Sequence, residues 1–252
     1  MSRTGTGDDP TIEPGGRYFT PAELARACVA AAGLPTGPEA TIADTSAGSG
    51  AWLDALLRED LRAAREAAQP LDLHRRRLIA LDVDPTAAAL QDLYAWSSAA
   101  HDWMAETLPA IWPASGRVDA IVGNPPYSIL QPVLDKRGIQ RVYAPSHKRA
   151  GQLRWKPVEV ATSHVLQDLR RADTVALVLR LSFLEGERWE RHPEMWSRLH
   201  EVHVIDPRAS FDGVATDGAV YALYVWRSTP HAGAPRLLRL RYRKAKQRRR
   251  GT

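Results

Sequence analysis

A five-residue segment, Gly-Asn-Pro-Pro-Tyr at 123–127, follows the apolar run VDAIV and groups an amide, two prolines and an aromatic ring. Proline neither continues a helix nor donates a hydrogen bond to a sheet, so the chain leaves this run on a stiff backbone. The side-chain oxygen of Asn124 and the carbonyl oxygen of Pro125 are hydrogen-bond acceptors, and Tyr127 offers a face for stacking. These groups suit chemistry that depends on positioning a partner rather than on an ionised base. The alternative is a proline-rich strand exit with a packing tyrosine.

A second candidate segment, DTSAGSG at 44–50, joins an apolar run to a helical pattern. Its small residues would let a ligand approach backbone amides and the start of a helix. Turns of this kind also occur in α/β proteins for packing alone. The segment therefore gains weight only from the motifs around it.

Acidic residues follow at the ends of the next two segments. In LDVD, Asp82 could accept the two hydroxyls of a ribose, whereas Asp84, directly before Pro85, suits the cap of a helix. In HDW, Asp102 could accept from an adenine amino group and Trp103 could form an apolar wall. The alternative for HDW is an exposed acid beside a core tryptophan.

Apolar periodicity predicts strands and helices in alternation, the pattern of parallel strands joined by right-handed helical crossovers. The expected fold class is α/β, a Rossmann-like, doubly wound, mostly parallel sheet. The last two strands have a connection too short for a helix, which predicts an antiparallel hairpin at the sheet edge. One helix is expected to have Thr20 as its cap, Pro21 as its first residue and Gly33 at its end. The expected strands lie at 40–45, 76–84, 118–124, 173–184, 201–207 and 219–227, and the expected helices at 20–34, 51–68, 85–97, 159–171 and 187–199.

The chain has 252 residues, of which 44% are hydrophobic and 25% charged, and is expected to form one principal core. The single cysteine, Cys28, excludes an internal disulfide and indicates a reducing compartment. No run reaches the ~20 apolar residues that span a bilayer, and the start of the chain lacks the apolar core of a signal peptide. A cytoplasmic protein is therefore expected. The histidines show no metal-site spacing with Cys28, so no metal is expected.

The net charge is +5, but the basic residues are unevenly placed. Nine Lys and Arg and no acid lie at 236–250, and seven and no acid lie at 136–156. Clustered cations displace counterions from phosphates, which favours a polyanionic partner over the alternative of solvated charge runs. The expected organisation is a flexible N-terminal segment at 1–17, a main domain at 18–228 with a basic substrate-contact loop at 128–157, and a basic C-terminal tail at 229–252. The alternative for the tail is an extra edge strand packed on the sheet through Leu237, Leu238, Leu240 and Tyr242.

The order of these segments resembles the motif order of S-adenosylmethionine-dependent DNA adenine-N6 methyltransferases. The matching segments are YFTP at 18–21, DTSAGSG, LDVDP, HDW and GNPPY. The resemblance spans about the first half of the chain, and the cofactor motif precedes the catalytic one, as in the group with FTP near the N-terminus. The closing segment at 202–226 is similar to the final hairpin of small phage-type members. The resemblance implies a class I methyltransferase fold, S-adenosyl-L-methionine as cofactor, and DNA as partner with a flipped adenine as substrate.

The resemblance also implies site residues, carried over motif by motif. Catalysis would rest on Asn124, Pro125, Pro126 and Tyr127. The cofactor would be bound by Thr20 near its methionine end and by Asp44, Gly48, Gly50, Asp82, Val83, Asp102 and Trp103. The substrate would be bound by Tyr127, Phe211, Lys148, Arg149 and Arg154.

The same resemblance gives the segment at 123–127 a physical role. An exocyclic adenine amine is a weak nucleophile because its lone pair is delocalised into the ring. If the Asn124 side-chain oxygen and the Pro125 carbonyl each accept one amine hydrogen, the nitrogen is drawn toward tetrahedral geometry. Alignment of two bound reactants supplies ~7–11 kcal/mol of barrier reduction, so no ionised base is required.

The partner stays open between several classes. Nothing after residue 228 is long or apolar enough for a separate target-recognition domain, so sequence readout would fall to the loop at 128–157. The alternative for that loop is a disordered surface segment. Similar proline segments occur in RNA guanine methyltransferases and in glutamine methyltransferases of release factors, which makes an RNA or protein substrate the alternative to DNA. A non-catalytic DNA-binding module with this fold is a further class.

Overall fold

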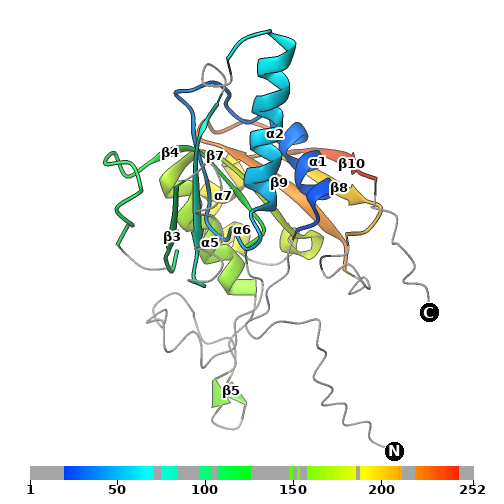
Figure 1. Cartoon of the computed structure of the whole chain (residues 1–252). Helices are drawn as coiled ribbons and strands as arrows, with labels where there is room; N and C mark the ends of the chain where they lie inside the picture. The colour runs from blue at the N-terminus through cyan, green and yellow to red at the C-terminus, as the bar shows by residue number, and fades with distance from the viewer. Residues whose placement is uncertain are drawn as a thin grey trace, which may run out of the picture.

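The computed structural model describes residues 20–70, 75–84, 97–103, 107–125, 148–149, 152–153, 158–185, 188–209, 211 and 219–243. Its centre is an eight-stranded sheet in the order β10-β8-β9-β7-β4-β1-β2-β3 (Figure 1). The strands are β1 (Thr41–Asp44), β2 (Arg77–Asp82), β3 (Ser97–Ala100), β4 (Val118–Gly123), β7 (Ala172–Arg180), β8 (Leu199–Asp206), β9 (Tyr221–Arg227) and β10 (Arg236–Arg241). A separate antiparallel pair joins β5 (Lys148–Arg149) to β6 (Gln152–Leu153).

The strand directions confirm the expected fold class. β3, β2, β1, β4 and β7 pair in parallel, and β9 pairs antiparallel with both β7 and β8. The hairpin between β8 and β9 is therefore confirmed. Its position at the sheet edge is wrong, because β10 pairs in parallel with β8 and lies outside it.

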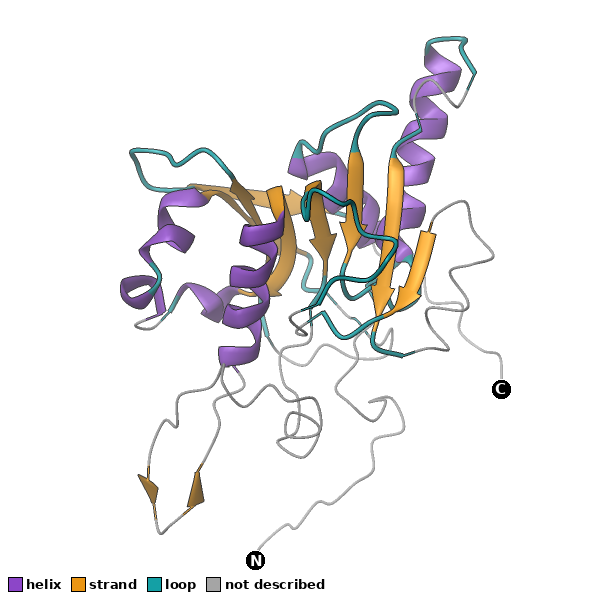
Figure 2. Ribbon diagram, turned by 90° about the vertical axis from the view of Figure 1, so that its left-hand side faces the viewer, coloured by secondary structure: helices purple, strands orange, loops and turns teal. Residues whose placement is uncertain are grey.

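Helices cover both faces of the sheet (Figures 1 and 2). α1 (Ala22–Ala32) and α2 (Ala51–Glu66) lie on one face, and α5 (Val158–Arg171), α6 (Arg188–Arg191) and α7 (Pro193–Arg198) lie on the other. Each central strand is apolar on both sides, since neighbouring residues belong to opposite cores: Ile42 packs with α1 and α2, and Ala43 with α5. Continuous apolar runs are what a sheet buried on both faces requires. No helix among the described residues is long and apolar enough to cross a membrane.

Two helical expectations need correction. α1 begins one residue later than expected: Pro21 occupies the cap position, and no side chain caps the helix. Thr20 instead accepts a hydrogen bond from the indole of Trp52, at 3.4 Å. The end at Gly33 is confirmed, since this residue is left-handed with φ 55°. The expected helix at 187–199 is split into α6 and α7 at His192, because the following proline disfavours helical backbone in the residue before it.

The C-terminal tail expected at 229–252 is also corrected in part, because the structure agrees with the alternative of an edge strand. Its residues 236–241 form β10, in which Leu240 is buried against α1 while Leu237 is exposed. Arg236 and Arg239 form ion pairs with Glu201 and Asp206 of β8. Residues 236–241 are therefore a strand of the sheet, although their many arginines are also typical of a solvated tail. The expected helix at 85–97 falls almost entirely outside the described residues, as do 1–17 and most of 128–157.

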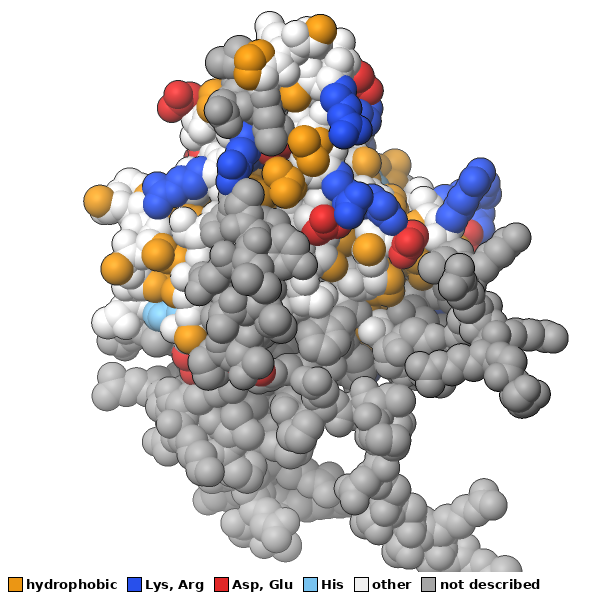
Figure 3. All heavy atoms as spheres, viewed as in Figure 1, with side chains coloured by type: hydrophobic (Ala, Val, Ile, Leu, Met, Phe, Trp, Pro, Cys, Tyr) orange, Lys and Arg blue, Asp and Glu red, His pale blue; other side chains and the backbone are white. Residues whose placement is uncertain are grey.

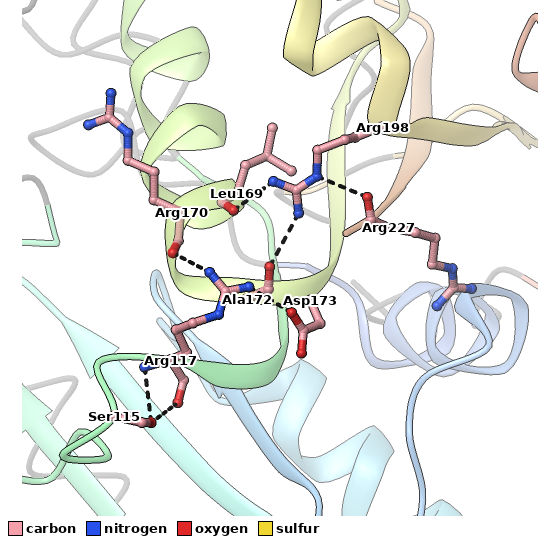
Figure 4. A network of polar contacts seen from close by, with 8 residues as sticks. All are labelled: Ser115, Arg117, Leu169, Arg170, Ala172, Asp173, Arg198 and Arg227. Atoms are coloured by element: carbon pink, nitrogen blue, oxygen red, sulfur yellow. Dashed lines mark hydrogen bonds and ion pairs between the residues drawn. The ribbon is translucent and has the colours of Figure 1, made fainter. Parts of the chain in front are cut away.

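Arginines hold the amino-terminal edge of the sheet together (Figure 4). Arg198 donates to the carbonyls of Leu169 and Arg227, at 2.8 and 2.9 Å. Arg117 donates to the carbonyl of Arg170 and pairs with Asp173, at 2.6 and 2.7 Å. Because the last carbonyls of a helix have no partner within it, these contacts satisfy the end of α5. Arg227 serves α1 in the same way through the carbonyls of residues 32 and 33.

Several surface cations of the described residues lie next to acids. In Figure 3, Lys and Arg side chains lie beside Asp and Glu side chains on the viewed face. Arg26 pairs with Glu23, and Arg58 pairs with Asp54, at 3.1 and 2.7 Å. The described part of this face therefore carries mixed charge rather than one basic patch.

The two leucines of β10 provide a test of its role. Leu240→Ala should lower the free energy of unfolding by ~2–5 kcal/mol, because it leaves a hole against α1. Leu237→Ala, on the same strand but exposed, should change it by less than ~0.5 kcal/mol. Urea unfolding of both variants gives the comparison, and equal small effects would mean that β10 is not part of the packed core.

Candidate functional site

The carboxyl ends of the parallel strands meet at one edge of the sheet, where the arrowheads of Figure 2 point. The loop at 45–50 leaves β1 here and enters α2. Gly48 and Gly50 both have positive φ, 48° and 77°, a conformation that side chains resist. The Ala47 N–H donates to the carbonyl of Leu81, at 2.9 Å, which ties the loop to β2. The glycine turn predicted from the sequence is therefore present, at the edge where open α/β sheets bind ligands.

Asp82, at the end of β2, fixes this loop. Its Oδ2 accepts from the Gly48 N–H at 2.8 Å, and its Oδ1 accepts from the Asp84 N–H at 2.9 Å. The carboxylate is buried, and Val83 beside it is exposed at the rim. Each carboxylate oxygen has a second lone pair, so Asp82 can hold the loop and still accept from a ligand hydroxyl.

Asp44, at the end of β1, is fully buried. Its Oδ1 accepts from the Ser46 N–H at 3.0 Å, whereas its Oδ2 has no hydrogen-bond partner among the described residues. Burial away from water raises the pKa of Asp44 to about 8, the Ser46 N–H opposes this, and the charges of Asp82 and Asp168 add to it. A cation placed here would relieve this penalty.

Gly123 brings the proline segment against Asp44. Its φ is 154°, and a Cβ on this residue would lie 2.9 Å from Asp44 Oδ1. The next residue, Asn124, lines a hollow together with Thr20, Ser46, Gly48 and Trp52. Three motifs that are far apart in the sequence therefore meet. Pro125 is buried, whereas Pro126 and Tyr127 lie outside the described residues.

The HDW segment follows β3, a strand that sequence reasoning missed because Ser-Ser-Ala-Ala carries little apolar signal. The His101 N–H donates to the carbonyl of Asp82, at 2.8 Å, which brings Asp102 near the end of β2. Trp103 is buried, with its ring packed on Trp112 at a centroid distance of 4.9 Å. This burial agrees with the alternative of a core tryptophan, and the role of Trp103 as an apolar wall for a ligand stays a prediction.

Three further polar residues at this edge, Ser46, His164 and Asp168, were not predicted as site residues from the sequence. His164 Nε2 lies 3.3 Å from Ser46 Oγ, and His164 Nδ1 lies 3.1 Å from Asp168 Oδ2. The Trp103 indole donates to Asp168 Oδ1 at 2.6 Å. The spacing of His164 and Asp168, four residues apart on α5, places them on one helix face and was the available signal.

The predicted substrate residues are less supported. Phe211 is buried and packs edge-on against Tyr221, at a centroid distance of 4.6 Å. Phe211 is thus part of the core among the described residues, and its packing against a target base stays a prediction. Lys148 and Arg149 lie in β5, whose side chains are not described, and Arg154 lies outside the described residues. No group of three or more His, Cys, Asp and Glu in the described ranges could hold a metal ion.

Comparison with known proteins gives the fold. No protein-family model matches the sequence, and no curated protein matches it. The chain superposes on a protein described as a class I S-adenosylmethionine-dependent methyltransferase from Listeria monocytogenes, with a TM-score of 0.61 and 10% identity over 94% of this chain and 68% of that one. It also superposes on the type I restriction-modification methyltransferase subunit from Streptococcus thermophilus, with a TM-score of 0.55 and 18% identity. This match covers 86% of this chain and 46% of that one. A modification subunit described as part of a type I restriction enzyme from Vibrio vulnificus gives a TM-score of 0.54 and 16% identity. This match covers 92% of this chain and 48% of that one.

The chain spans about half the length of these two restriction-modification subunits. At such low identities the likeness shows the class I methyltransferase fold, which the sequence resemblance had implied. The likeness carries no information on which side chains react.

Gly123 yields a prediction about the close contact with Asp44. Gly123→Ala should lower the free energy of unfolding by ~1–3 kcal/mol, because the added methyl would press on the carboxylate. Gly233→Ala is the matched control, since nothing lies within 4 Å of the position. Chemical unfolding of both variants tests the contact, and equal stability would contradict it.

Asp44 predicts a pH dependence of stability. Its folded-state pKa of about 8 lies above the ordinary value of 3.8, so between these values the folded chain keeps a proton that the unfolded chain releases. The contribution of this group is therefore fully present below pH ~4 and falls by ~1.4 kcal/mol per pH unit until the folded pKa is reached. Asp44→Asn, which cannot ionise, should show a flatter profile in urea unfolding between pH ~5 and ~7.5. Parallel profiles would contradict the assignment.

Proposed function

We propose that this chain transfers a methyl group from S-adenosyl-L-methionine to the exocyclic N6 of adenine in DNA. The observation that carries the proposal is the shared hollow, in which Asn124 of the proline segment meets Thr20 and the glycine loop. In such a hollow a cofactor bound by the loop would lie next to the acceptors of Asn124. The fold supports the reaction class, and the sequence motifs support the substrate.

The residues at this edge fit the proposed cofactor. S-Adenosyl-L-methionine carries a cationic sulfonium and an ammonium group, and Asp44 is a buried carboxyl whose Oδ2 is unpartnered within the described ranges. Asp82 has lone pairs left for ribose hydroxyls, and Val83 is exposed beside it for one face of the adenine. Asp102 would accept from the adenine amino group. When bound, the cofactor supplies an electrophilic methyl group on sulfur.

The catalytic role of Asn124 and Pro125 is to orient the amine. Their side-chain and backbone oxygens each accept one amine hydrogen, which directs the nitrogen lone pair at the methyl carbon. The cofactor would supply the methyl group and leave as a neutral thioether, and the amine would release one proton to water. Positioning of the two reactants supplies ~7–11 kcal/mol of the barrier reduction. Gly123 lets the backbone of these residues approach Asp44.

Besides the motifs, the basic residues of particular segments support the DNA assignment. Arg236 and Arg239 are paired with acids within the sheet, so they are poor candidates for phosphate contacts. The cations at 136–156 and those after residue 243 remain, and they would bind the phosphate backbone. In this proposal Tyr127 stacks on the flipped base. RNA and protein substrates are the other outcomes of the test below.

The test uses S-adenosylmethionine labelled in its methyl group, with separate pools of DNA, RNA and protein. Label should enter DNA as N6-methyladenine, identified after nuclease digestion. Asn124→Ala should lower the single-turnover rate by at least ~100-fold, because it removes an oriented acceptor. Its calorimetric affinity for the cofactor should stay within ~3-fold of the parent, because a transition-state loss leaves binding intact.

Asp82→Asn is the matched variant with the opposite expected pattern. It keeps the side-chain shape but replaces one acceptor oxygen with an NH2 group, so cofactor binding should weaken. Label found only in protein or RNA would refute the DNA assignment. Equal loss of cofactor binding in both variants would refute the division of roles.

A further inference from the structure

Helix α5 reaches the candidate site through a buried chain of polar groups. Ser46, on the glycine loop, contacts His164, and His164 contacts Asp168. His164 is 3% exposed and Asp168 is 0% exposed, so these groups are not placed to bind a ligand themselves. Burying such groups is costly unless they are paired, and here they pair with a loop that lines the hollow.

We propose that His164 and Asp168 are positioning residues that fix the Ser46 hydroxyl as a hydrogen-bond acceptor for the amino group of a bound S-adenosyl-L-methionine. This inference rests on the proposed function, and it names the residues that orient one end of the cofactor.

The direction of each hydrogen bond follows from the partners. Tryptophan N–H only donates, so Asp168 Oδ1 accepts from Trp103. Asp168 Oδ2 accepts from the His164 ring, which assigns the ring proton to Nδ1. In this tautomer Nε2 is an acceptor, so the Ser46 O–H donates to it. The only hydrogen of the hydroxyl is then used.

The consequence concerns what Ser46 can offer a ligand. With its hydrogen held by His164, Ser46 Oγ keeps only lone pairs, and Ser46 is half-buried on the wall of the hollow. A group that donates hydrogen bonds, such as an ammonium, fits this oxygen, and a carboxylate does not. Asp44, whose backbone-bonded carboxyl lies two residues earlier, favours a cation at the same place.

The same chain also links two motifs of the site. Asp168 holds Trp103, next to Asp102, through one oxygen and the His164–Ser46 pair through the other. The loop after β1 and the segment after β3 are therefore fixed to one carboxylate on α5. Asp168 on α5 is thus a second reference point for both segments, in addition to the end of β2.

The test compares two ligands by calorimetry on the full chain. S-Adenosylmethionine carries the amino-acid end, whereas 5′-methylthioadenosine lacks it. Ser46→Ala should lower the affinity for S-adenosylmethionine roughly 5- to 20-fold, the loss of about one hydrogen bond to a charged group. Its affinity for methylthioadenosine should stay within ~2-fold of the parent's. Ser46→Thr, which keeps the hydroxyl, should restore most of the affinity.

His164→Asn tests the link to α5. The asparagine amide can still donate to Asp168 but does not reach the Ser46 hydroxyl. The variant should therefore lower the affinity for S-adenosylmethionine as much as Ser46→Ala does. The double variant should be no weaker than either single one, because both remove the same interaction. Ser163→Ala, on the same helix, is the control and should bind like the parent. The methyl-transfer rate of Ser163→Ala should also match that of the parent, which checks that the helix is intact.

The outcomes separate this inference from the proposed function. If the parent binds neither ligand, the cofactor assignment fails and the inference falls with it. If the parent binds S-adenosylmethionine but Ser46→Ala lowers the affinity for both ligands equally, or for neither, the orienting role is refuted while the cofactor assignment stands. Should His164→Asn fail to fold, the Ser46 variants alone decide, because Ser46 lies on a half-buried loop position.

Discussion

The bond between the Asp82 carboxylate and the Gly48 N–H is the contact on which the candidate site depends. It joins the end of β2 to the loop that follows β1, across 34 residues of sequence. The loop's positive φ angles are held by this bond and by the Ala47 contact to Leu81. With the loop fixed, Ser46, Gly48 and Asn124 line one hollow. Parallel pairing of β1 with both β2 and β4 supplies the frame.

Burying acids together at one edge has an energetic cost that the sheet must carry. Asp44 keeps a pKa well above its ordinary value because water is excluded and because Asp82 and Asp168 are near. A protein selected only for stability would place apolar groups here. The apolar cores on both faces of the sheet offset the cost. The arrangement makes sense for a site that receives a cationic ligand, in keeping with the proposed cofactor.

The two edges of the sheet divide the charged residues by task. At the amino-terminal edge, Arg117, Arg198 and Arg227 donate to helix-end carbonyls and serve the fold. At the carboxyl edge, the buried charged groups are carboxylates. This division explains why net charge alone is a poor guide to a binding surface: several cations of the chain are committed to internal carbonyls and ion pairs.

Local patterns in the sequence determined the parallel sheet, the glycine loop and the acid at the end of β2, because each depends on residues close together in the chain. Tertiary structure decided the rest. β3 is poor in apolar residues and is a strand because it pairs with β2. At 236–241 the sequence allowed both a charged tail and an edge strand, and pairing with β8, which buries Leu240, decided for the strand. Packing placed Phe211 and Trp103 in the cores, which their motifs alone left open. His164 meets Ser46 across 118 residues, a contact that no local pattern encodes, since it exists only once α5 packs on the sheet.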